Sequence, residues 1–517
     1  MRCLYAASEV AGFAKTGGLA DVAGSLPRAL AERGVDCAVI MPLYRSVRTG
    51  GNHLQSTGLS FSIPIGSHAV SGSLRRGCLP HSRVPIFFVE QPEFFERDDP
   101  KAGAGLYQYT LPDGGKRDYP DNSARFIFFC RAILEAMRLL DYWPDVLHVN
   151  DWQTGLLPVY VQEQRKAHRI TRSGEPSRLA GPKPDVGEKI AKVRTLLTIH
   201  NIAYQGTFWH LDMPLTGLPW SLFNYEQLEF HGHINFLKGG IVFADSITTV
   251  SPMYSREIQT PYYGCGLHGV LAQRSHDLHG IVNGVDYRTW DPAIDPFLPA
   301  TYDPSRVQTG KAICKKALQS HFGLPEKPRT PLLGIVSRLV DQKGLDLLGE
   351  CASALLKHDL QLVVLGEGDP TYHALLLELR KEFPARVGVT IGQDEKLAHQ
   401  IEGGADIFLM PSLYEPCGLN QLYSLKYGTV PLVRATGGLA DTVVDATEEN
   451  LAAGRATGFA FLPYTAAALL ETVHRALCLY VDQPARWLAL QQTGMRQDWS
   501  WNRSAAEYEK LYRDLVK

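Results

Sequence analysis

The stretch Asp406–Asp441, DIFLMPSLYEPCGLNQLYSLKYGTVPLVRATGGLAD, decides the fold of this 517-residue chain. The apolar run Ile407–Met410 predicts a strand, and the loop after it carries one carboxylate, Glu415. Leucine and tyrosine then recur at helical spacing, and a second apolar run, Val430–Arg434, leads to a Gly-Gly turn. Strand, loop, helix and strand in this order are typical of a parallel α/β sheet, in which ligands gather at the carboxyl ends of the strands.

Two predicted helices in this stretch begin directly after glycine-containing turns, Pro416-Cys417-Gly418 and Thr436-Gly437-Gly438. The free N–H groups and the positive dipole end of a helix start suit a phosphate. A carboxylate beside two such starts favours a phosphorylated ligand that also carries hydroxyl groups. The alternative for Glu415 is a carboxylate that only serves the start of the helix after it. We interpret Cys417 as a small packing residue, because no histidine lies near it to activate a thiol.

The hexapeptide Thr-Gly-Gly-Leu-Ala-Asp occurs twice, at Thr16–Asp21 and at Thr436–Asp441. We interpret the copies as two glycine-rich turns, one in each half of the molecule, that face one ligand; two unrelated helix starts are the alternative. Lys15 precedes the first copy and could add its ammonium to the helix dipole at a phosphate. Arg338 and Lys343 bracket a loop after another strand and could meet a diphosphate. Solvated or ion-paired surface cations are the alternative for all three.

Composition excludes several function classes. The formal net charge is −2, which implies no nucleic-acid partner, and 45% hydrophobic and 21% charged residues are ordinary for a globular protein. Nine cysteines without a CxxC pair indicate reduced thiols. No apolar run reaches membrane-spanning length and no targeting segment is evident, so we expect a cytoplasmic protein without a membrane partner. No His/Cys/Asp cluster has metal-ligand spacing, so we expect no metal site.

Alternating strand and helix patterns predict two α/β domains, with a change in sequence composition near residues 275–290 that indicates the boundary between them. We place the domains at 1–278 and 279–490, and we expect residues 491–517 to form a helix that packs back on the first domain. The basic segment 165–190 shows no periodicity and is predicted to be a mobile surface insertion. Six aromatic residues could offer stacking faces to a sugar polymer, with about half expected in the core: Tyr107, Tyr109, Tyr119, Trp152, Tyr204 and Trp209.

Six motifs occur in order along the chain: Lys15–Asp21, Asn150-Asp151-Trp152, His200-Asn201, Ser337-Arg338 with Lys343-Gly344, Glu415–Leu419 and Thr436–Asp441. Together they resemble the bacterial glycogen synthase and plant starch synthase family. The resemblance runs from residue 2 to about residue 500. The Lys15 motif is highly specific to that family, whereas the Glu415 motif alone would admit many related glycosyltransferases.

The resemblance implies a GT-B fold, with two Rossmann-like domains whose parallel sheets face a central cleft, the first on the acceptor side and the second on the nucleotide-sugar side. It implies ADP-glucose as donor, the non-reducing end of an α-1,4-glucan (glycogen or a starch-like polymer) as acceptor, retention of configuration and no cofactor. The catalytic residues it implies are His200, Arg338, Lys343, Glu415 and Asp21. The substrate-binding residues it implies are Lys15, Gly17, Gly18, Asn201, Asn283, Cys417, Gly418, Leu419, Thr436, Gly437 and Gly438.

Two positions depart from the wider pattern: Gln153 stands where some relatives have histidine, and Tyr423 stands where broader retaining relatives carry a second glutamate. Retaining glycosidases need two carboxylates about 5 Å apart, and we find no partner for Glu415. That favours front-face transfer, in which a donor phosphate oxygen accepts the acceptor proton.

Competing interpretations remain at this stage. One is a related retaining transferase that uses UDP-glucose or makes a disaccharide; the Lys15 motif argues against it. Glycogen phosphorylase would need a pyridoxal-bearing lysine context, which we do not find. A non-catalytic glucan-binding protein is the third, and the full set of cations argues against it, because a binder has no use for diphosphate neutralisation.

Overall fold

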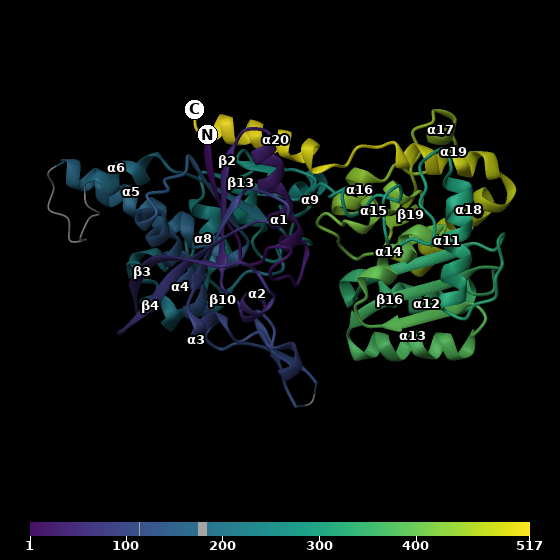
Figure 1. The fold of residues 1–517 in the computed structure, drawn as a ribbon, viewed down its shortest axis with the longest axis horizontal. Helices are drawn as coiled ribbons and strands as arrows, with labels where there is room; N and C mark the ends of the chain where they lie inside the picture. Colours follow the sequence, from purple (N-terminus) through teal and green to yellow (C-terminus); the bar gives the residue numbers. More distant parts are fainter. Residues whose placement is uncertain (113, 174–183) are drawn as a thin grey trace. The chain divides into compact units, whose positions relative to one another are not determined.

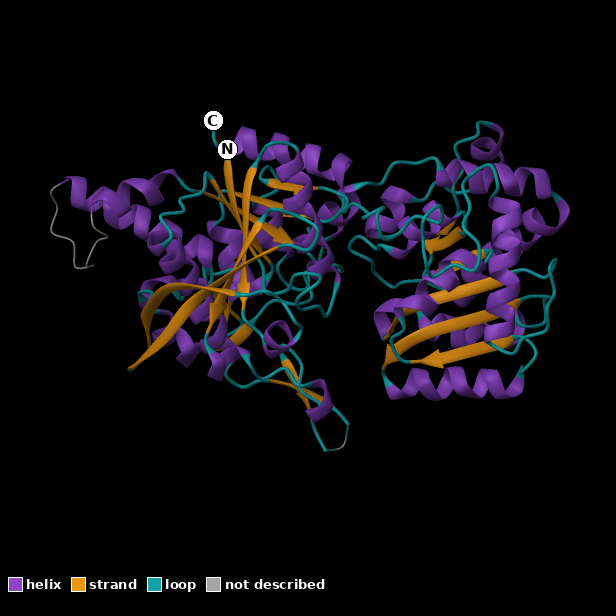
Figure 2. Cartoon of the chain, in the orientation of Figure 1, coloured by secondary structure: helices purple, strands orange, loops and turns teal. Residues whose placement is uncertain are grey.

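The computed structural model describes residues 1–112, 114–173 and 184–517, which divide into two compact units (Figure 1). Unit 1 comprises Met1–Val250, Ser255–Ile281 and Trp501–Lys517, and unit 2 comprises Ser251–Tyr254 and Val282–Ser500. Each unit contains its own sheet of parallel strands flanked by helices (Figure 2), which confirms the predicted α/β class.

Unit 1 is built on a nine-stranded sheet in the order β14-β13-β9-β8-β1-β2-β5-β4-β3. Neighbours from β14 to β5 are parallel, whereas β3, β4 and β5 pair antiparallel. Among the parallel strands the chain order reverses between β1 and β8, and open α/β sheets bind ligands at such a switch point. The strands are β1 (Arg2–Ala6), β2 (Asp36–Pro42), β3 (Gln55–Ile65), β4 (His68–Cys78), β5 (Pro85–Glu90), β8 (Val146–Asn150), β9 (Arg194–Ile199), β13 (Ser246–Thr249) and β14 (Leu278–Gly280).

The central strands β1 and β8 of unit 1 are buried along almost their whole length, as expected for parallel strands whose two faces are covered by helices. Helix α1 follows β1 and ends before Gly34, whose φ of +87° and N–H bond to the Ala31 carbonyl close the helix. The main helices are α1 (Gly18–Glu32), α4 (Asn122–Leu139), α5 (Leu157–Ser173), α6 (Pro184–Lys192), α8 (Phe236–Phe243) and α20 (Trp501–Leu515). A small antiparallel sheet combines β10 (Thr207–Trp209), β12 (His233–Asn235) and β11 (Glu229–Phe230).

The C-terminal helix α20 is part of unit 1 and packs against α1. The hydroxyl of Tyr512 lies 2.6 Å from His148 Nδ1, and the other ring nitrogen of His148 lies 2.6 Å from Thr198 Oγ1. Burial lowers the pKa of His148 well below its usual value, so the ring is neutral and joins the helix to β8 and β9 by hydrogen bonds. At the surface, Arg33 and Glu509 form a 2.7 Å ion pair.

The prediction of a mobile insertion without periodic structure at 165–190 is wrong for most of this range. Helix α5 continues to Ser173, and α6 occupies Pro184–Lys192. Residues 174–183, which the prediction also covered, lie outside the described residues. Arg165 fills a buried position of α5, where its guanidinium forms a two-pronged ion pair with Asp245 at 2.9 and 3.0 Å. A buried arginine interrupts the apolar pattern by which a helix is recognised in a sequence, and for this reason the sequence analysis did not predict this part of α5.

Unit 2 is built on a six-stranded sheet in the order β17-β16-β15-β18-β19-β20, with every pair parallel. This is the strand order of a Rossmann fold, and its chain order reverses between β15 and β18. The strands are β15 (Leu332–Leu339), β16 (Gln361–Gly368), β17 (Val387–Ile391), β18 (Ile407–Met410), β19 (Val430–Arg434) and β20 (Phe459–Phe461). The helices include α11 (Val307–His321), α12 (Leu345–Leu355), α13 (Pro370–Glu382), α14 (Glu395–Gly404), α15 (Asn420–Tyr427), α16 (Gly437–Thr442), α18 (Ala466–Asp482) and α19 (Pro484–Met495).

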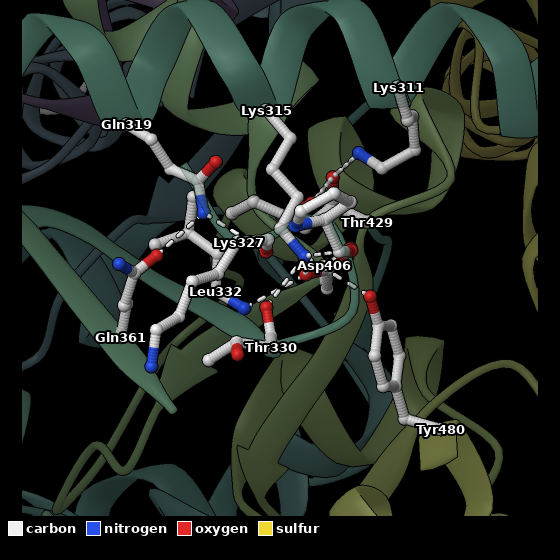
Figure 3. Close-up of polar contacts among 12 residues, drawn as sticks. Lys311, Lys315, Gln319, Lys327, Thr330, Leu332, Gln361, Asp406, Thr429 and Tyr480 are labelled. Carbon is white, nitrogen blue, oxygen red and sulfur yellow. Dashed lines mark hydrogen bonds and ion pairs between the residues drawn. The ribbon is translucent and has the colours of Figure 1, made fainter. Parts of the chain in front are cut away.

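Helix α11 is fixed to this sheet by buried polar side chains (Figure 3). Lys315 Nζ forms a 2.6 Å ion pair with Asp406 Oδ2, and the same carboxylate oxygen accepts the Leu332 N–H at 2.8 Å. One turn away, Lys311 Nζ donates to the Gly403 carbonyl at 2.9 Å and to Thr429 Oγ1 at 2.5 Å. Asp406 therefore ties the start of β15 and the start of β18 to one helix, which fixes the two strands at the switch point.

Candidate active site

The loops after β15 and β18 bring a lysine and a glutamate together at the switch point of unit 2. Lys343 Nζ lies 2.6 Å from Glu415 Oε2, and Ser412 Oγ donates to the same oxygen at 3.0 Å. The Glu415 residue is only 6% exposed, and the lysine side chain is mostly buried as well. A pair this well shielded is screened less than a surface ion pair, so its charges act strongly on any group beside them.

The two loops are held at this distance by backbone contacts. Gly344 has φ of +71°, and a Cβ at this position would lie 2.1 Å from the Pro411 carbonyl oxygen, so only glycine lets the loops meet. Gln342 joins them from both ends, since its carbonyl accepts the Leu413 N–H at 2.9 Å and its Nε2 donates to the Tyr414 carbonyl at 3.1 Å. The Lys343–Glu415 geometry therefore rests on rigid backbone.

The second Thr-Gly-Gly turn packs directly on the Glu415 loop. A Cβ on Gly437 would lie 2.0 Å from the Glu415 carbonyl oxygen, and one on Gly438 would lie 2.1 Å from the Cys417 carbonyl oxygen. The Gly438 N–H donates to the Glu415 carbonyl at 3.1 Å. Thr436, which precedes the two glycines, is fully buried. These glycines are thus required by packing within unit 2.

The remaining predicted residues of the Glu415 motif form the start of α15. Gly418 has φ of +69°, and Leu419 is the residue before the helix. Gln421 Nε2 donates to the carbonyls of Cys417 and Gly418, each at 3.0 Å. Burial raises the pKa of the Cys417 thiol to about 12, which keeps it protonated and unreactive. The main chain of Asn283 bonds to this thiol, which places Asn283, itself 4% exposed, beside the same loop.

Arg338 and Tyr423 lie in different surroundings. Arg338 is exposed near the end of β15, where its Nη2 lies 3.4 Å from Gln342 Oε1. Tyr423 is buried on α15 and stacks on Trp290 with ring centroids 3.9 Å apart. The other face of Trp290 stacks on His399 at 3.7 Å. The position that carries a second glutamate in broader relatives is occupied here by a stacked ring.

In unit 1, the loop after β1 folds around a buried carboxylate, Glu9, that sequence analysis missed. Its two oxygens accept the Thr16 N–H at 2.5 Å, the Thr16 hydroxyl at 2.6 Å and the Gly17 N–H at 3.2 Å. The Tyr107 hydroxyl donates to it at 2.8 Å. Its only signal in the sequence is its position directly after the first strand, where loops of parallel sheets hold ligands.

The two glycines of this loop differ from their copies in unit 2. A Cβ on Gly17 or on Gly18 would meet no atom within 4 Å, and neither residue has a positive φ. Helix α1 begins at Gly18, and Gly17 at its N-cap provides no side chain to bond the first N–H groups. Lys15 Nζ is paired with Asp21 Oδ1 at 2.6 Å and is largely exposed. This part of the loop is therefore open to a ligand.

His200 follows β9 and bonds to the residues after β8. Asn150 Nδ2 donates to the Ala6 carbonyl at 3.0 Å, which turns its Oδ1 toward the Tyr5 hydroxyl at 2.9 Å and His200 Nε2 at 2.8 Å. An amide oxygen only accepts, so Nε2 of His200 carries the proton. Burial lowers the pKa of His200 to about 3. The imidazole is therefore neutral and cannot act as a proton donor through Nδ1.

Asp151 fixes the backbone beside this histidine. Its Oδ1 accepts the His200 N–H at 2.7 Å, and its φ of +53° is uncommon for a residue with a side chain. Burial raises the pKa of this carboxyl to about 7. Asn201 forms a local turn in which its Oδ1 accepts the Ala203 N–H at 3.0 Å.

The six aromatic residues separate by exposure. Trp152 is buried and contacts Phe126, and Tyr107, Tyr109 and Tyr119 are half-buried. Tyr204 and Trp209 have more than half of their surface exposed. Within the described part of the chain, no group of three or more His, Cys, Asp or Glu side chains is arranged to hold a metal ion. Across the same residues, no helix combines the length and apolar character needed to cross a bilayer.

Each unit thus contributes charged and hydrogen-bonding groups at the switch point of its sheet. In unit 2 these are the paired Lys343 and Glu415 with Arg338 nearby; in unit 1 they are the Lys15 loop and the neutral His200. Cations and free helix N–H groups suit an anionic diphosphate, and carboxylate and imidazole groups suit sugar hydroxyls.

Comparison with known proteins identifies relatives along the whole chain. The family model described as the starch synthase catalytic domain matches residues 2–173 and 184–273, and the model for glycosyl transferases group 1 matches residues 318–487. The glycogen synthase of Thioalkalivibrio sulfidiphilus is 49% identical over 524 residues, and that of Anaeromyxobacter dehalogenans strain 2CP-C is 47% identical over 516 residues. In both cases the match covers 100% of each chain.

Solved structures of glycosyltransferases are also similar to this chain. The catalytic domain of starch synthase IV from Arabidopsis thaliana, bound to ADP and acarbose, has a TM-score of 0.85 and 30% identity, with 100% of this chain and 99% of that chain covered. Sucrose-phosphate synthase from Thermosynechococcus elongatus shares the fold at a TM-score of 0.55 and 16% identity.

Proposed function

The chain belongs to the glycogen and starch synthase family of retaining GT-B glycosyltransferases, and from this we propose that it transfers glucose from ADP-glucose to the non-reducing end of an α-1,4-glucan. Glucan synthesis itself follows from full-length identity of up to 49% to glycogen synthases. The choice of ADP-glucose rests on the Lys15 motif and on the relative that holds ADP. The observation that carries the proposal is the buried Lys343–Glu415 pair at a Rossmann switch point.

In unit 2 we assign the leaving group to the cations and the sugar to the carboxylate. Lys343 and Arg338 neutralise the diphosphate as ADP departs, which is electrostatic stabilisation of developing charge. Glu415 and the backbone of Cys417, Gly418 and Leu419 hold sugar hydroxyls and phosphate. The conformation of this loop is fixed by four residues that pack against it, an assignment supported by the close approach of the glycines to its backbone: Thr436, Gly437, Gly438 and Asn283. The thiol of Cys417 takes no part, because it stays protonated.

In unit 1 we assign the open loop to the substrates. Lys15, Gly17 and Gly18 meet the donor phosphates, and Asp21 orients Lys15 and a sugar hydroxyl. The neutral His200, backed by Asn150, supports the transferred glucose through its ring or its carbonyl, and Asn201 holds the turn that follows. A neutral imidazole does not repel the positive charge that develops at the anomeric carbon during transfer.

Retention of configuration requires the acceptor hydroxyl to bond to the anomeric carbon on the face of the sugar from which the diphosphate departs. The stacked Tyr423 leaves Glu415 without a second carboxylate from α15. This supports front-face transfer, in which a donor phosphate oxygen takes the proton of the acceptor hydroxyl. We place the reaction in the cytoplasm, since all nine cysteines are free thiols, as expected in a reducing compartment.

The direct test is to incubate the purified protein with glycogen and either ADP-glucose or UDP-glucose, and to measure both nucleoside diphosphate release and glucan growth. We expect rapid ADP release with equal incorporation of glucose. Preference for UDP-glucose would overturn the donor assignment and leave the fold and cation roles in place. Glycogen binding without release from either donor would favour a non-catalytic binding protein.

A further inference from the structure

Trp290 lies between two rings of unit 2 that belong to different helices. Its indole stacks on His399 of α14 with centroids 3.7 Å apart and an interplanar angle of 11°, and on Tyr423 of α15 at 3.9 Å and 1°. Most aromatic pairs in proteins are offset or tilted and have centroids about 4.5–7 Å apart. Two close and nearly parallel contacts on one indole therefore require that the surroundings hold all three rings.

The ring of His399 is held by a buried carboxylate. Its Nδ1 lies 2.7 Å from Asp295 Oδ2, and the Tyr427 hydroxyl donates to the same oxygen at 2.6 Å. Burial alone would raise the pKa of Asp295, but the bonds from His399 and Tyr427 hold this pKa below its usual value, so the carboxyl group is ionised. The side chains of Asp295 and His399 are fully buried, which fixes this face of the stack.

Tyr423 connects the stack to the start of α15. Its N–H donates at 3.0 Å to the carbonyl of Leu419, which is the residue before the helix. Leu419 and Trp290 both pack against the apolar cluster that contains Tyr423. Because we assign the backbone of Cys417, Gly418 and Leu419 to the donor, the position of Tyr423 sets where this backbone lies.

The segment before Trp290 leads to the same loop. Trp290 closes a turn in which its N–H donates to the Asp286 carbonyl at 2.9 Å, and Val285 belongs to the apolar cluster beside the stack. Asn283, two residues earlier, contacts the Cys417 thiol through its main chain and is 4% exposed. Within the described residues, its side-chain Oδ1 has no hydrogen-bond partner, which is unusual for a buried amide and fits a group that bonds to a ligand.

We propose that Trp290 is a positioning residue for the donor: its indole holds the start of α15 and the segment of Asn283 where the phosphate and the sugar of the nucleotide sugar bind. The proposal rests on the proposed function, which places the donor at this loop. Trp290 acts through Tyr423 and Leu419 and not by contact with the donor. A shift of about 1 Å in a group that contacts the substrate can lower turnover about 100-fold, so loss of the ring should affect catalysis as well as stability.

The test measures kcat and KM with whichever nucleotide sugar the wild-type protein uses, together with thermal unfolding. In Trp290→Leu, which keeps an apolar side chain and removes the ring, we expect kcat/KM for the donor to fall about 10- to 100-fold. Tyr423→Leu breaks the same stack from α15 and should give a similar loss, which also provides the comparison if Trp290→Leu does not fold. The double variant should lose little more than either single variant, because both changes break one contact. Trp290→Phe, which keeps a ring, should retain most of kcat/KM.

The matched control is Trp487→Leu. Trp487 is another buried indole of unit 2, 5% exposed, and it stacks on Phe459 in the main apolar core of this unit. Its loss should lower the unfolding temperature at least as much as Trp290→Leu and leave kcat/KM unchanged. Wild-type kcat/KM in Trp290→Leu and in Tyr423→Leu would overturn the proposal. An equal loss in Trp487→Leu would assign the effect to general destabilisation, and additive losses in the double variant would show that the two rings act separately; either result also overturns it.

Binding of ADP, measured by calorimetry, provides a readout that needs no transfer of glucose. The affinity for ADP should fall about tenfold in Trp290→Leu, the size of one weakened hydrogen bond to a charged phosphate, and stay at the wild-type value in Trp487→Leu. A wild-type protein that binds ADP without transferring glucose would refute the proposed function alone, and the ADP affinities of the variants would still decide the role of Trp290.

Discussion

The Lys343 ammonium lies 2.6 Å from the Glu415 carboxylate although 72 positions separate the two residues in the sequence. They meet because β15 and β18 are neighbours at the point where the chain order of the sheet reverses. One charge suits a diphosphate and the other suits sugar hydroxyls. Under the proposed function, the pair meets the diphosphate and the sugar of the donor at one place in unit 2.

The two copies of the Thr-Gly-Gly turn should respond oppositely to added methyl groups. Gly18→Ala fills open space at a helix start, so we expect unchanged or slightly higher stability, by at most about 1 kcal/mol. The KM for ADP-glucose should rise about tenfold or more, because the methyl occupies space meant for the ligand. Gly438→Ala should instead destabilise the protein by about 3 kcal/mol, because its Cβ meets the Cys417 carbonyl oxygen.

Thermal unfolding and donor kinetics on both variants check this prediction. Gly34→Ala, at a positive φ beyond the site, is a control for general glycine loss and should lower stability without changing KM. A Gly18→Ala variant with the wild-type KM would show that the open space serves no donor.

Glu9 should act as a positioning residue for the Lys15 loop. Glu9→Gln replaces one acceptor oxygen by an NH2 group, which cannot accept both the N–H groups and the hydroxyl that now bond to the carboxylate. We expect kcat/KM for ADP-glucose to fall about 10- to 100-fold. Stability should fall by about 1–2 kcal/mol for the lost buried bond.

Steady-state kinetics on Glu9→Gln and on the exposed control Glu93→Gln test this. The control should behave like the wild-type protein. Equal kcat/KM values in all three proteins would mean that the loop needs no carboxylate to reach its active conformation.

A site residue could be predicted from the sequence only where it belongs to a motif or follows a predicted strand. Lys343 and Glu415 each follow a predicted strand, so the strand pattern predicted both as candidate site residues, whereas the structure shows that their two strands are neighbours. Glu9 belongs to no repeat, and its role depends on a short loop that folds back so that Val10 and Ala14 pair. No periodicity in a sequence reports such a contact.

The same reasoning explains the other misses. Helix α5 was hidden because a buried Arg165 takes the place of an apolar residue and its partner, Asp245, is distant in the sequence. Trp209 was noted as a stacking residue, but the contact of its ring neighbour His210 with Phe223 was not predicted, because irregular backbone separates the two residues. Contacts across loops depend on tertiary structure, and only the elements with a regular period were recoverable from sequence.

Stability should depend on pH through a buried glutamate in unit 2. Burial raises the pKa of Glu402 from 4.5 to about 8, so the folded state binds more protons than the unfolded state between these values. The free energy of unfolding should therefore fall as pH rises from about 4.5 to 8. Lys311, whose pKa burial lowers from 10.5 to about 8, acts in the opposite sense above pH 8, where stability should recover.

Urea unfolding at pH 5 and pH 8 checks this with Glu402→Gln, which keeps a partner for the Ser424 hydroxyl. The variant should lose about 2–4 kcal/mol less than the wild-type protein between the two pH values. The exposed control Glu378→Gln should follow the wild-type curve. Identical pH dependence in Glu402→Gln and the wild-type protein would show that Glu402 is ionised in the folded state across the range.

The most direct measurement of the central claim compares turnover with glucan affinity in Lys343→Ala. If Lys343 neutralises the departing diphosphate, kcat for ADP release should fall at least about 100-fold, as for loss of one group that stabilises developing charge. Glycogen affinity, measured without donor, should stay at the wild-type value. Loss of glycogen affinity with turnover retained would contradict the assignment of the Lys343–Glu415 pair to the leaving group and the transferred sugar.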